Sequence, residues 1–273
     1  MLDFLKSFIL GIIEGITEWL PVSSTGHLII AREFLQFDNV TDSFYSMYSV
    51  VIQLGAIMAI ALTFIKRLFP LEKTQSGIII KKDILSIWGK IFIGCVPAGI
   101  IGILFDEVID MYFYSYKTVA FTLIIYGILF IIIENRKKTC SPAFTDVSQI
   151  DQKTSLLIGG FQVLSLIPGT SRSGATILGG MLLGADRTSA AEFTFFMAIP
   201  IMAGASAIKL LDFGFNFTMN ELVILIIGFV TAFLVSVITV KWLLKFVKKH
   251  TFKAFGIYRI LLGVIVLLYF SFK

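Results

Sequence analysis

The sequence predicts an all-α polytopic membrane protein with an inverted-topology repeat, two re-entrant helical hairpins and six transmembrane helices. Three observations predict this fold: the composition, the long apolar blocks, and two polar loops of similar sequence. Of the 273 residues, 57% are hydrophobic and only 15% are charged, whereas soluble domains carry about 25% charged residues. The apolar blocks lack the two-residue alternation of a membrane β-barrel, so the spanning elements are predicted to be helices.

Six apolar blocks are long enough to cross the hydrocarbon core of a bilayer. A core of about 30 Å requires about 20 helical residues. The predicted spans are 44–66, 86–105, 117–134, 188–209, 221–244 and 253–272.

Two further regions, about 5–34 and about 154–185, each contain a polar break between two short apolar runs. Irregular backbone at membrane depth is tolerated only where protein or a water-filled cavity satisfies its polar groups. Both regions are therefore predicted to be re-entrant hairpins whose loops line a site. A pair of long, kinked spans is the alternative interpretation.

The charges of the loops predict the orientation. Lys and Arg are concentrated in loops 66–85, 135–153 and 245–253, whereas segments 35–43, 106–116 and 210–220 contain neither residue type. Because cytoplasmic loops are enriched in Lys and Arg, the first three loops are predicted to face the cytoplasm.

Threading the chain through this assignment gives two halves of opposite orientation within one membrane domain, residues 1–140 and 141–273. LPVSSTG at 20–26 aligns with IPGTSRS at 167–173, which pairs Pro21 with Pro168 and Ser24 with Ser171. Inverted repeats of this kind bring their two broken helices together near the bilayer midplane, so the two polar loops are expected to meet.

Other classes of protein are disfavoured by the composition. The net charge of +5 comes from short loops between apolar blocks, which indicates membrane anchoring and not nucleic-acid binding. Cys95 and Cys140 have no partner at ligand spacing, so neither a disulfide framework nor a zinc site is expected. The first apolar run begins with an acidic residue and is interrupted by glutamates, so we expect the N-terminal segment to be retained and not cleaved as a signal peptide.

The first polar loop contains a pair of carboxylates. Glu14 and Glu18 are four residues apart and lie on one face of a helix. Two adjacent carboxylates at membrane depth require a cation, which could be a divalent metal, an arginine or a proton shared by the pair. The alternative is that both glutamates lie at the interface and contact water.

The second polar loop has the composition of a phosphate-binding site. Arg172 is surrounded by Ser171, Ser173 and Thr176, and hydroxyls, helix-start N–H groups and a planar guanidinium together suit a phosphate. In the first loop, His27 is a candidate proton carrier. A buried arginine that neutralises the glutamates and a structural histidine are the corresponding alternatives.

Facing acids, hydroxyls, a histidine and an arginine in a membrane cavity favour phosphoryl transfer on an anionic lipid. A transporter or flippase for an anionic or lipid-phosphate substrate is the main rival, because such carriers also use inverted repeats and broken helices. A non-catalytic scaffold is a third class.

The motifs EGITEWLPVSSTGHL at 14–28 and PGTSRSGAT at 168–176 resemble those of the undecaprenyl pyrophosphate phosphatases, the bacitracin-resistance family of bacterial membrane enzymes. The resemblance extends over nearly the whole chain. It implies a hydrolase of the bacterial plasma membrane that converts undecaprenyl pyrophosphate to undecaprenyl phosphate and inorganic phosphate. Such an enzyme recycles the lipid carrier for peptidoglycan and cell-wall synthesis and confers bacitracin resistance. It further implies dependence on a divalent cation, Mg or Ca, and a site open to the outer face.

The resemblance also implies roles for individual residues. Ser24 is expected to be the nucleophile or to position an attacking water, with His27 as its proton partner and Arg172 as the clamp on the transition state. The full expected set comprises the catalytic residues Glu18, Ser24, His27 and Arg172; the pyrophosphate-binding residues Ser23, Thr25, Ser171, Arg172, Ser173 and Thr176; and the metal-binding residues Glu14 and Glu18. A monomer and a homodimer both remain compatible with the sequence.

Overall fold

The computed structural model describes residues 2–38, 40–74, 77–113, 115–136 and 141–272. Within these residues, six helices are long and apolar enough to span a membrane, as the sequence predicts. They are α3 (Asp42–Thr63), α5 (Lys82–Phe113), α6 (Tyr116–Arg136), α9 (Arg187–Phe213), α10 (Met219–Lys249) and α11 (Lys253–Ser271). The basic residues Lys137 and Lys138 and the thiol of Cys140 lie outside the described residues.

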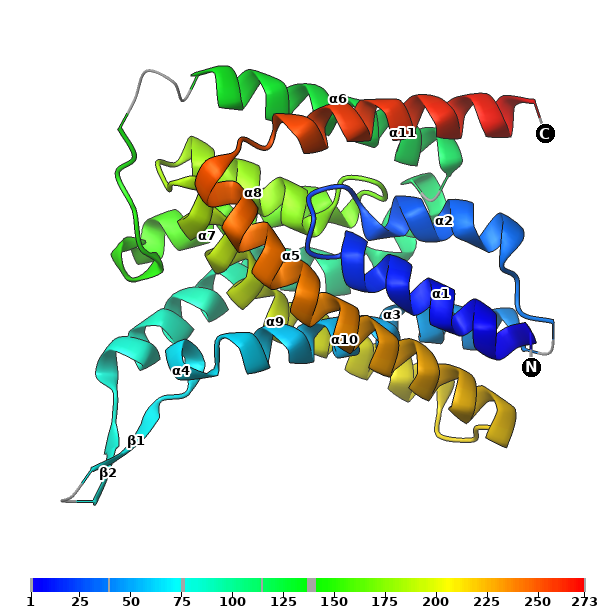
Figure 1. The fold of residues 1–273 in the computed structure, drawn as a ribbon, viewed down its shortest axis with the longest axis horizontal. Coiled ribbons are helices and arrows are strands. Elements are labelled where there is room, and N and C mark those ends of the chain that lie inside the picture. Colours follow the sequence, from blue (N-terminus) through cyan, green and yellow to red (C-terminus); the bar gives the residue numbers. More distant parts are fainter. Residues whose placement is uncertain (1, 39, 75–76, 114, 137–140, 273) are drawn as a thin grey trace.

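Two pairs of shorter helices occupy the regions predicted to be hairpins. The first pair is α1 (Leu2–Thr17) and α2 (Ser24–Phe34); the second is α7 (Gln152–Val163) and α8 (Arg172–Leu182), with the 3₁₀ turns η2 (Val147–Gln149) and η3 (Leu164–Leu166) beside α7. Each of these helices is shorter than the roughly 20 residues that span a bilayer. The polar loops between the arms contact each other in the middle of the molecule (Figure 1).

One element was not expected from the sequence. The basic segment after α3 contains the short helix α4 (Ile65–Leu68) and an antiparallel hairpin of β1 (Leu71–Thr74) and β2 (Gly77–Ile80). The run of three isoleucines in β2 is typical of a strand, but an apolar run of this length cannot be assigned by periodicity alone. This hairpin projects from one end of the molecule, whereas both termini lie at the opposite end (Figure 1).

The first arm of each short pair packs on a long helix of the other half through a serine and a glycine. On α1, Ser7 donates a hydrogen bond to the Ile224 carbonyl of α10 (2.6 Å), and a Cβ at Gly11 would lie 2.7 Å from the Gly228 oxygen. Only glycine permits such a close approach of two backbones. The Ser7 hydroxyl thus finds its hydrogen-bond acceptor on the neighbouring helix, as is common between membrane helices.

The second pair has the same arrangement on α5. Ser155 of α7 donates to the Lys90 carbonyl, and a Cβ at Gly159 would lie 2.2 Å from the Gly94 oxygen. The serine and glycine are four residues apart in both arms. The packing of α7 on α5 therefore repeats the packing of α1 on α10.

The second arms also begin alike. Ser23 (φ 74°) and Ser171 (φ 72°) precede α2 and α8, and each side chain accepts a hydrogen bond from the glycine N–H three residues later. Positive φ is uncommon for a residue other than glycine and marks a strained position. By this geometry Ser23 corresponds to Ser171, so the pairing of Ser24 with Ser171 expected from the sequence was one residue out of register.

Candidate active site

The two polar loops bring three of the expected site residues into direct contact. The chain turns at 18–22 between α1 and α2, which places Ser24 beside Glu18, and the Ser24 hydroxyl donates to Glu18 Oε2 at 2.6 Å. From the second loop, Arg172 Nη2 donates to Glu18 Oε1 at 3.1 Å. A hydroxyl, a carboxylate and an orienting guanidinium are therefore joined in series across the interface between the two hairpins.

Arg172 is held by two further contacts. Its Nη1 donates to the Thr194 carbonyl of α9 at 3.0 Å. Its guanidinium carbon lies 5.7 Å from the centroid of the Trp19 ring, a distance suited to a cation–π interaction. The Nε–H has no hydrogen-bond partner among the described residues, so one donor of this guanidinium remains for a ligand.

Glu14 is completely buried, and neither of its carboxylate oxygens accepts a hydrogen bond within the described part of the chain. It lies close enough to Glu18 and Arg172 to interact electrostatically with both. A buried carboxylate normally has a partner, because burial of an unpaired charge costs several kcal/mol or more. This environment excludes the alternative in which the two glutamates only contact interfacial water.

The expected proton partnership between His27 and Ser24 is not present in the structure. His27 Nδ1 lies 2.7 Å from the Ser23 carbonyl, and Nε2 lies 2.6 Å from the Tyr258 hydroxyl of α11. Since a carbonyl only accepts, Nδ1 carries the proton, and in the neutral ring Nε2 accepts from Tyr258. Both ring nitrogens of His27 are therefore engaged by Ser23 and Tyr258, and the group that accepts from the Ser24 hydroxyl is the Glu18 carboxylate.

Most of the expected phosphate-binding hydroxyls are engaged in holding the loops. Ser173 donates to the carbonyls of Glu18 and Leu20, both at 3.2 Å, and Thr176 donates to the Arg172 carbonyl at 2.8 Å. The oxygens of Ser23 and Ser171 cap helices, as described above. Thr25 is partly exposed and lines a cavity next to the site.

Arg259 of α11 is a polar residue next to the site that was not predicted from the sequence, and its side chain is completely buried. It donates to the Pro21 carbonyl of the first loop at 3.1 Å, and to the Gly169 and Thr170 carbonyls of the second at 3.0 and 2.9 Å. One guanidinium thus joins both loops. An arginine within an apolar span is itself a signal of function or pairing, and this signal was available in the sequence.

Comparison with known proteins identifies the family. A family model described as bacitracin resistance protein BacA matches residues 7–265. A protein of Desulfitobacterium hafniense named undecaprenyl-diphosphatase is 56% identical over 272 residues, covering 99% of this chain and 97% of the relative. An undecaprenyl-diphosphatase of Enterococcus faecalis is 54% identical, covering 98% of this chain and 97% of the relative. The chain therefore belongs to the bacitracin resistance protein BacA family.

Proposed function

We propose that this chain hydrolyses undecaprenyl pyrophosphate to undecaprenyl phosphate and inorganic phosphate in a bacterial plasma membrane. Two relatives with more than half of their residues identical are named for this activity. The observation that carries the proposal is the series Ser24, Glu18 and Arg172, in which a hydroxyl donates to a carboxylate oriented by a guanidinium. A hydroxyl beside a base that a third group orients is the arrangement of an activated nucleophile, which suits phosphoryl transfer.

The chemistry assigned to these residues begins at the Ser24 oxygen. The Ser24 oxygen, or a water positioned by it, attacks the terminal phosphorus, and the proton of the attacking hydroxyl or water passes to Glu18 Oε2. The bond from that phosphorus to the bridging oxygen breaks, and undecaprenyl phosphate leaves. If Ser24 is the nucleophile, a water then cleaves the phosphoserine and releases inorganic phosphate. Arg172 stabilises the charge on the transferring phosphoryl oxygens through its unpartnered Nε–H.

A divalent cation, Mg or Ca, is part of this proposal. The carboxylate oxygens of Glu14 suit such a cation, because they are buried without a hydrogen-bond donor and hard cations prefer oxygen ligands. No group of three or more His, Cys, Asp or Glu side chains among the described residues could hold a metal. Glu14 and Glu18 would therefore share the cation with substrate oxygens, as Mg commonly does. When bound, it would neutralise charge on the phosphates.

The opening of the site to the outer face also belongs to the proposal. It is supported by the loop charges and by the position of the cavity lined by Thr25, which is bordered by the start of α6 and the end of α11. Both helix ends lie on the side opposite the basic segment that contains β1 and β2 (Figure 1). Substrate would then reach the site from the outer leaflet.

The experiment that tests the function measures phosphate release from undecaprenyl pyrophosphate by detergent-purified protein. Release should require Mg or Ca, stop with a chelator, and fall by at least about 100-fold in Glu18→Gln and Arg172→Ala. Each variant is checked for an unchanged melting profile. No release by well-folded parent protein in any metal would contradict the enzyme and direct the work to transport in liposomes.

A second measurement separates the two nucleophiles. Rapid quenching of the parent enzyme with terminally labelled substrate should trap label on Ser24 if attack is covalent. Ser24→Ala should then show no labelled protein and no turnover. Full turnover by a folded Ser24→Ala variant would leave only the water mechanism.

A further inference from the structure

A cavity of about 1000 Å³ lies directly beside the catalytic loops. Its floor includes Thr25, which follows Ser24, and Pro168, which begins the second polar loop. The cavity therefore adjoins the polar loops, while the side chains of Glu18, Ser24 and Arg172 are not among those that line it. A substrate in the cavity would lie next to the residue that follows Ser24.

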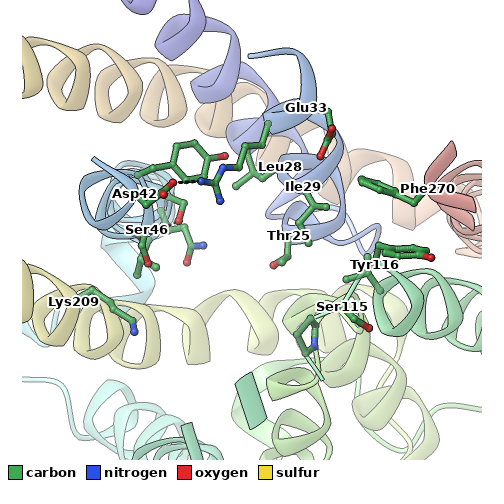
Figure 2. A pocket seen from close by; sticks show the side chains of 17 residues that line it. Thr25, Leu28, Ile29, Glu33, Asp42, Ser46, Ser115, Tyr116, Lys209 and Phe270 are labelled. Carbon is green, nitrogen blue, oxygen red and sulfur yellow. Dashed lines mark hydrogen bonds and ion pairs between the residues drawn. The ribbon is translucent and has the colours of Figure 1, made fainter. Parts of the chain in front are cut away.

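The two sides of the cavity differ in polarity. Figure 2 shows Asp42, Ser46 and Lys209 on one side, where the polar side chains of α3 recur at helical spacing. Ser49 and Gln53 extend this polar stripe along α3. Charges of both signs line the cavity. Arg32 pairs with Asp42 at one edge, Lys209 lies on the side of α3, and Glu33 lies on the opposite side, near Ile29 (Figure 2).

Three apolar or aromatic side chains lie on the opposite side, below Glu33 in the view of Figure 2. Figure 2 shows Ile29, Tyr116 and Phe270 there, contributed by α2, α6 and α11. The rings of Tyr116 and Phe270 stack with centroids 5.1 Å apart. These three side chains are only partly buried, and each is backed by the packed cluster of Val119, Ala120, Leu123, Leu262 and Val266. The wall is thus preformed and has surface left for a ligand.

We propose that Ile29, Tyr116 and Phe270 form a subsite for the isoprene units next to the pyrophosphate of the lipid substrate. This inference rests on the proposed function for the identity of the head group. The occupant follows from the division of the cavity: an amphiphile with a charged head at Thr25 and Pro168 would place its first apolar units on the aromatic wall and leave the α3 side to water. Tyr116 begins α6 and Phe270 lies near the end of α11, so the stacked rings place this wall at one end of the two helices.

The kinetic test compares farnesyl and undecaprenyl pyrophosphate as substrates of Phe270→Ala and Tyr116→Ala. If the wall contacts only the isoprene units next to the pyrophosphate, each substitution should raise KM by about tenfold for both chain lengths and largely retain kcat. Phe272→Ala is the matched control, because Phe272 is two residues away, is 87% exposed and does not line the cavity. The subsite is contradicted if the cavity variants resemble this control, or if only the longer substrate is affected.

A binding measurement keeps the subsite separate from the hydrolytic activity. Ser115 also lines the cavity, so Ser115→Cys in a background without Cys95 and Cys140 should react with a soluble thiol reagent. A non-hydrolysable farnesyl methylenediphosphonate should protect this thiol, whereas inorganic methylenediphosphonate should protect it less. Equal labelling with and without the prenyl compound would overturn the subsite. Protection without any phosphate release by the parent would instead contradict the proposed function alone.

Discussion

At the scale of single residues, the site is held together by one arginine that the reaction does not use. Arg259 is completely buried and donates to carbonyls of both polar loops, with its guanidinium 5.6 Å from the centroid of the Tyr126 ring. Carbonyls in a membrane interior have no water to replace such a donor. Arg259 is therefore a positioning residue for Ser24 and Arg172.

Arg259→Met should lower both stability and activity. Each carbonyl left without a donor costs about 1–3 kcal/mol, so the melting temperature of the detergent-purified protein should fall by several degrees. Arg259→Lys should recover part of the stability but less of kcat, because an ammonium cannot reach both loops with the fork geometry of a guanidinium. Lys241→Met, at an exposed position of α10, is the control. Unchanged kcat in a folded Arg259→Met variant would contradict the positioning role.

Glu14→Gln tests whether the orphaned carboxylate of Glu14 holds a cation. Removing its charge should raise the Mg concentration for half-maximal activity by at least about tenfold, because a carboxylate is the stronger ligand for a hard cation. In metal-free buffer the same change should leave the melting temperature equal or higher, since it relieves repulsion from Glu18. A Mg titration identical to that of the parent would show that Glu14 holds no catalytic cation.

At the scale of elements, the second polar loop depends on a glycine. Gly169 has φ of +86°, and a Cβ there would lie 2.2 Å from Thr122 Oγ1 of α6. The same threonine hydroxyl donates to the Pro168 carbonyl at 2.8 Å, which fixes the loop against α6. The close approach leaves no room for a side chain.

Gly169→Ala should therefore displace the loop that carries Arg172, with a loss of activity of at least about tenfold and lower thermal stability. Gly160→Ala is the matched control, because Gly160 lies within α7 and no heavy atom would come within 4 Å of its Cβ. That change should be neutral or stabilising by up to about 1 kcal/mol. Activity assays and melting curves on both variants check the prediction, and parent-like Gly169→Ala would refute it.

At the scale of the whole molecule, the repeated packing of the first arms supports the inverted repeat that we propose for residues 1–140 and 141–273. Glu14 follows Gly11 by three residues, and Gln162 follows Gly159 by three residues. Both side chains are buried and have polar atoms without a hydrogen-bond partner among the described residues. By this correspondence the second half carries an uncharged amide where the first carries a carboxylate. The two halves would thus share a scaffold while the acidic chemistry is confined to the first.

The orientation can be tested in cells with single cysteines in a background without Cys95 and Cys140. Asn216→Cys, between α9 and α10, should react with a membrane-impermeant thiol reagent added to intact cells. Lys249→Cys, at the opposite end of α10, should react only after permeabilisation. The reverse pattern would contradict the proposed outward-facing site.

The sequence by itself determined the helical membrane class, the six spans, the two short interrupted pairs and the two polar loops between their arms. These are local properties, because the length of an apolar block and the residues of a loop do not depend on distant contacts. The polar loops could be expected to meet from the inverted arrangement of the halves. The β hairpin could not be recognised, since a short apolar run fits more than one element.

Only the tertiary structure decided which partner each polar group has. His27 bonds to Tyr258, 231 residues away, and not to the nearby Ser24, whereas Ser24 bonds to Glu18. Ser173 and Thr176 bond to backbone instead of facing a ligand. Arg259 joins two loops that are far from it in the chain. Each outcome depends on how helices from the two halves approach, and hydrogen bonding in a water-poor interior makes that approach decisive.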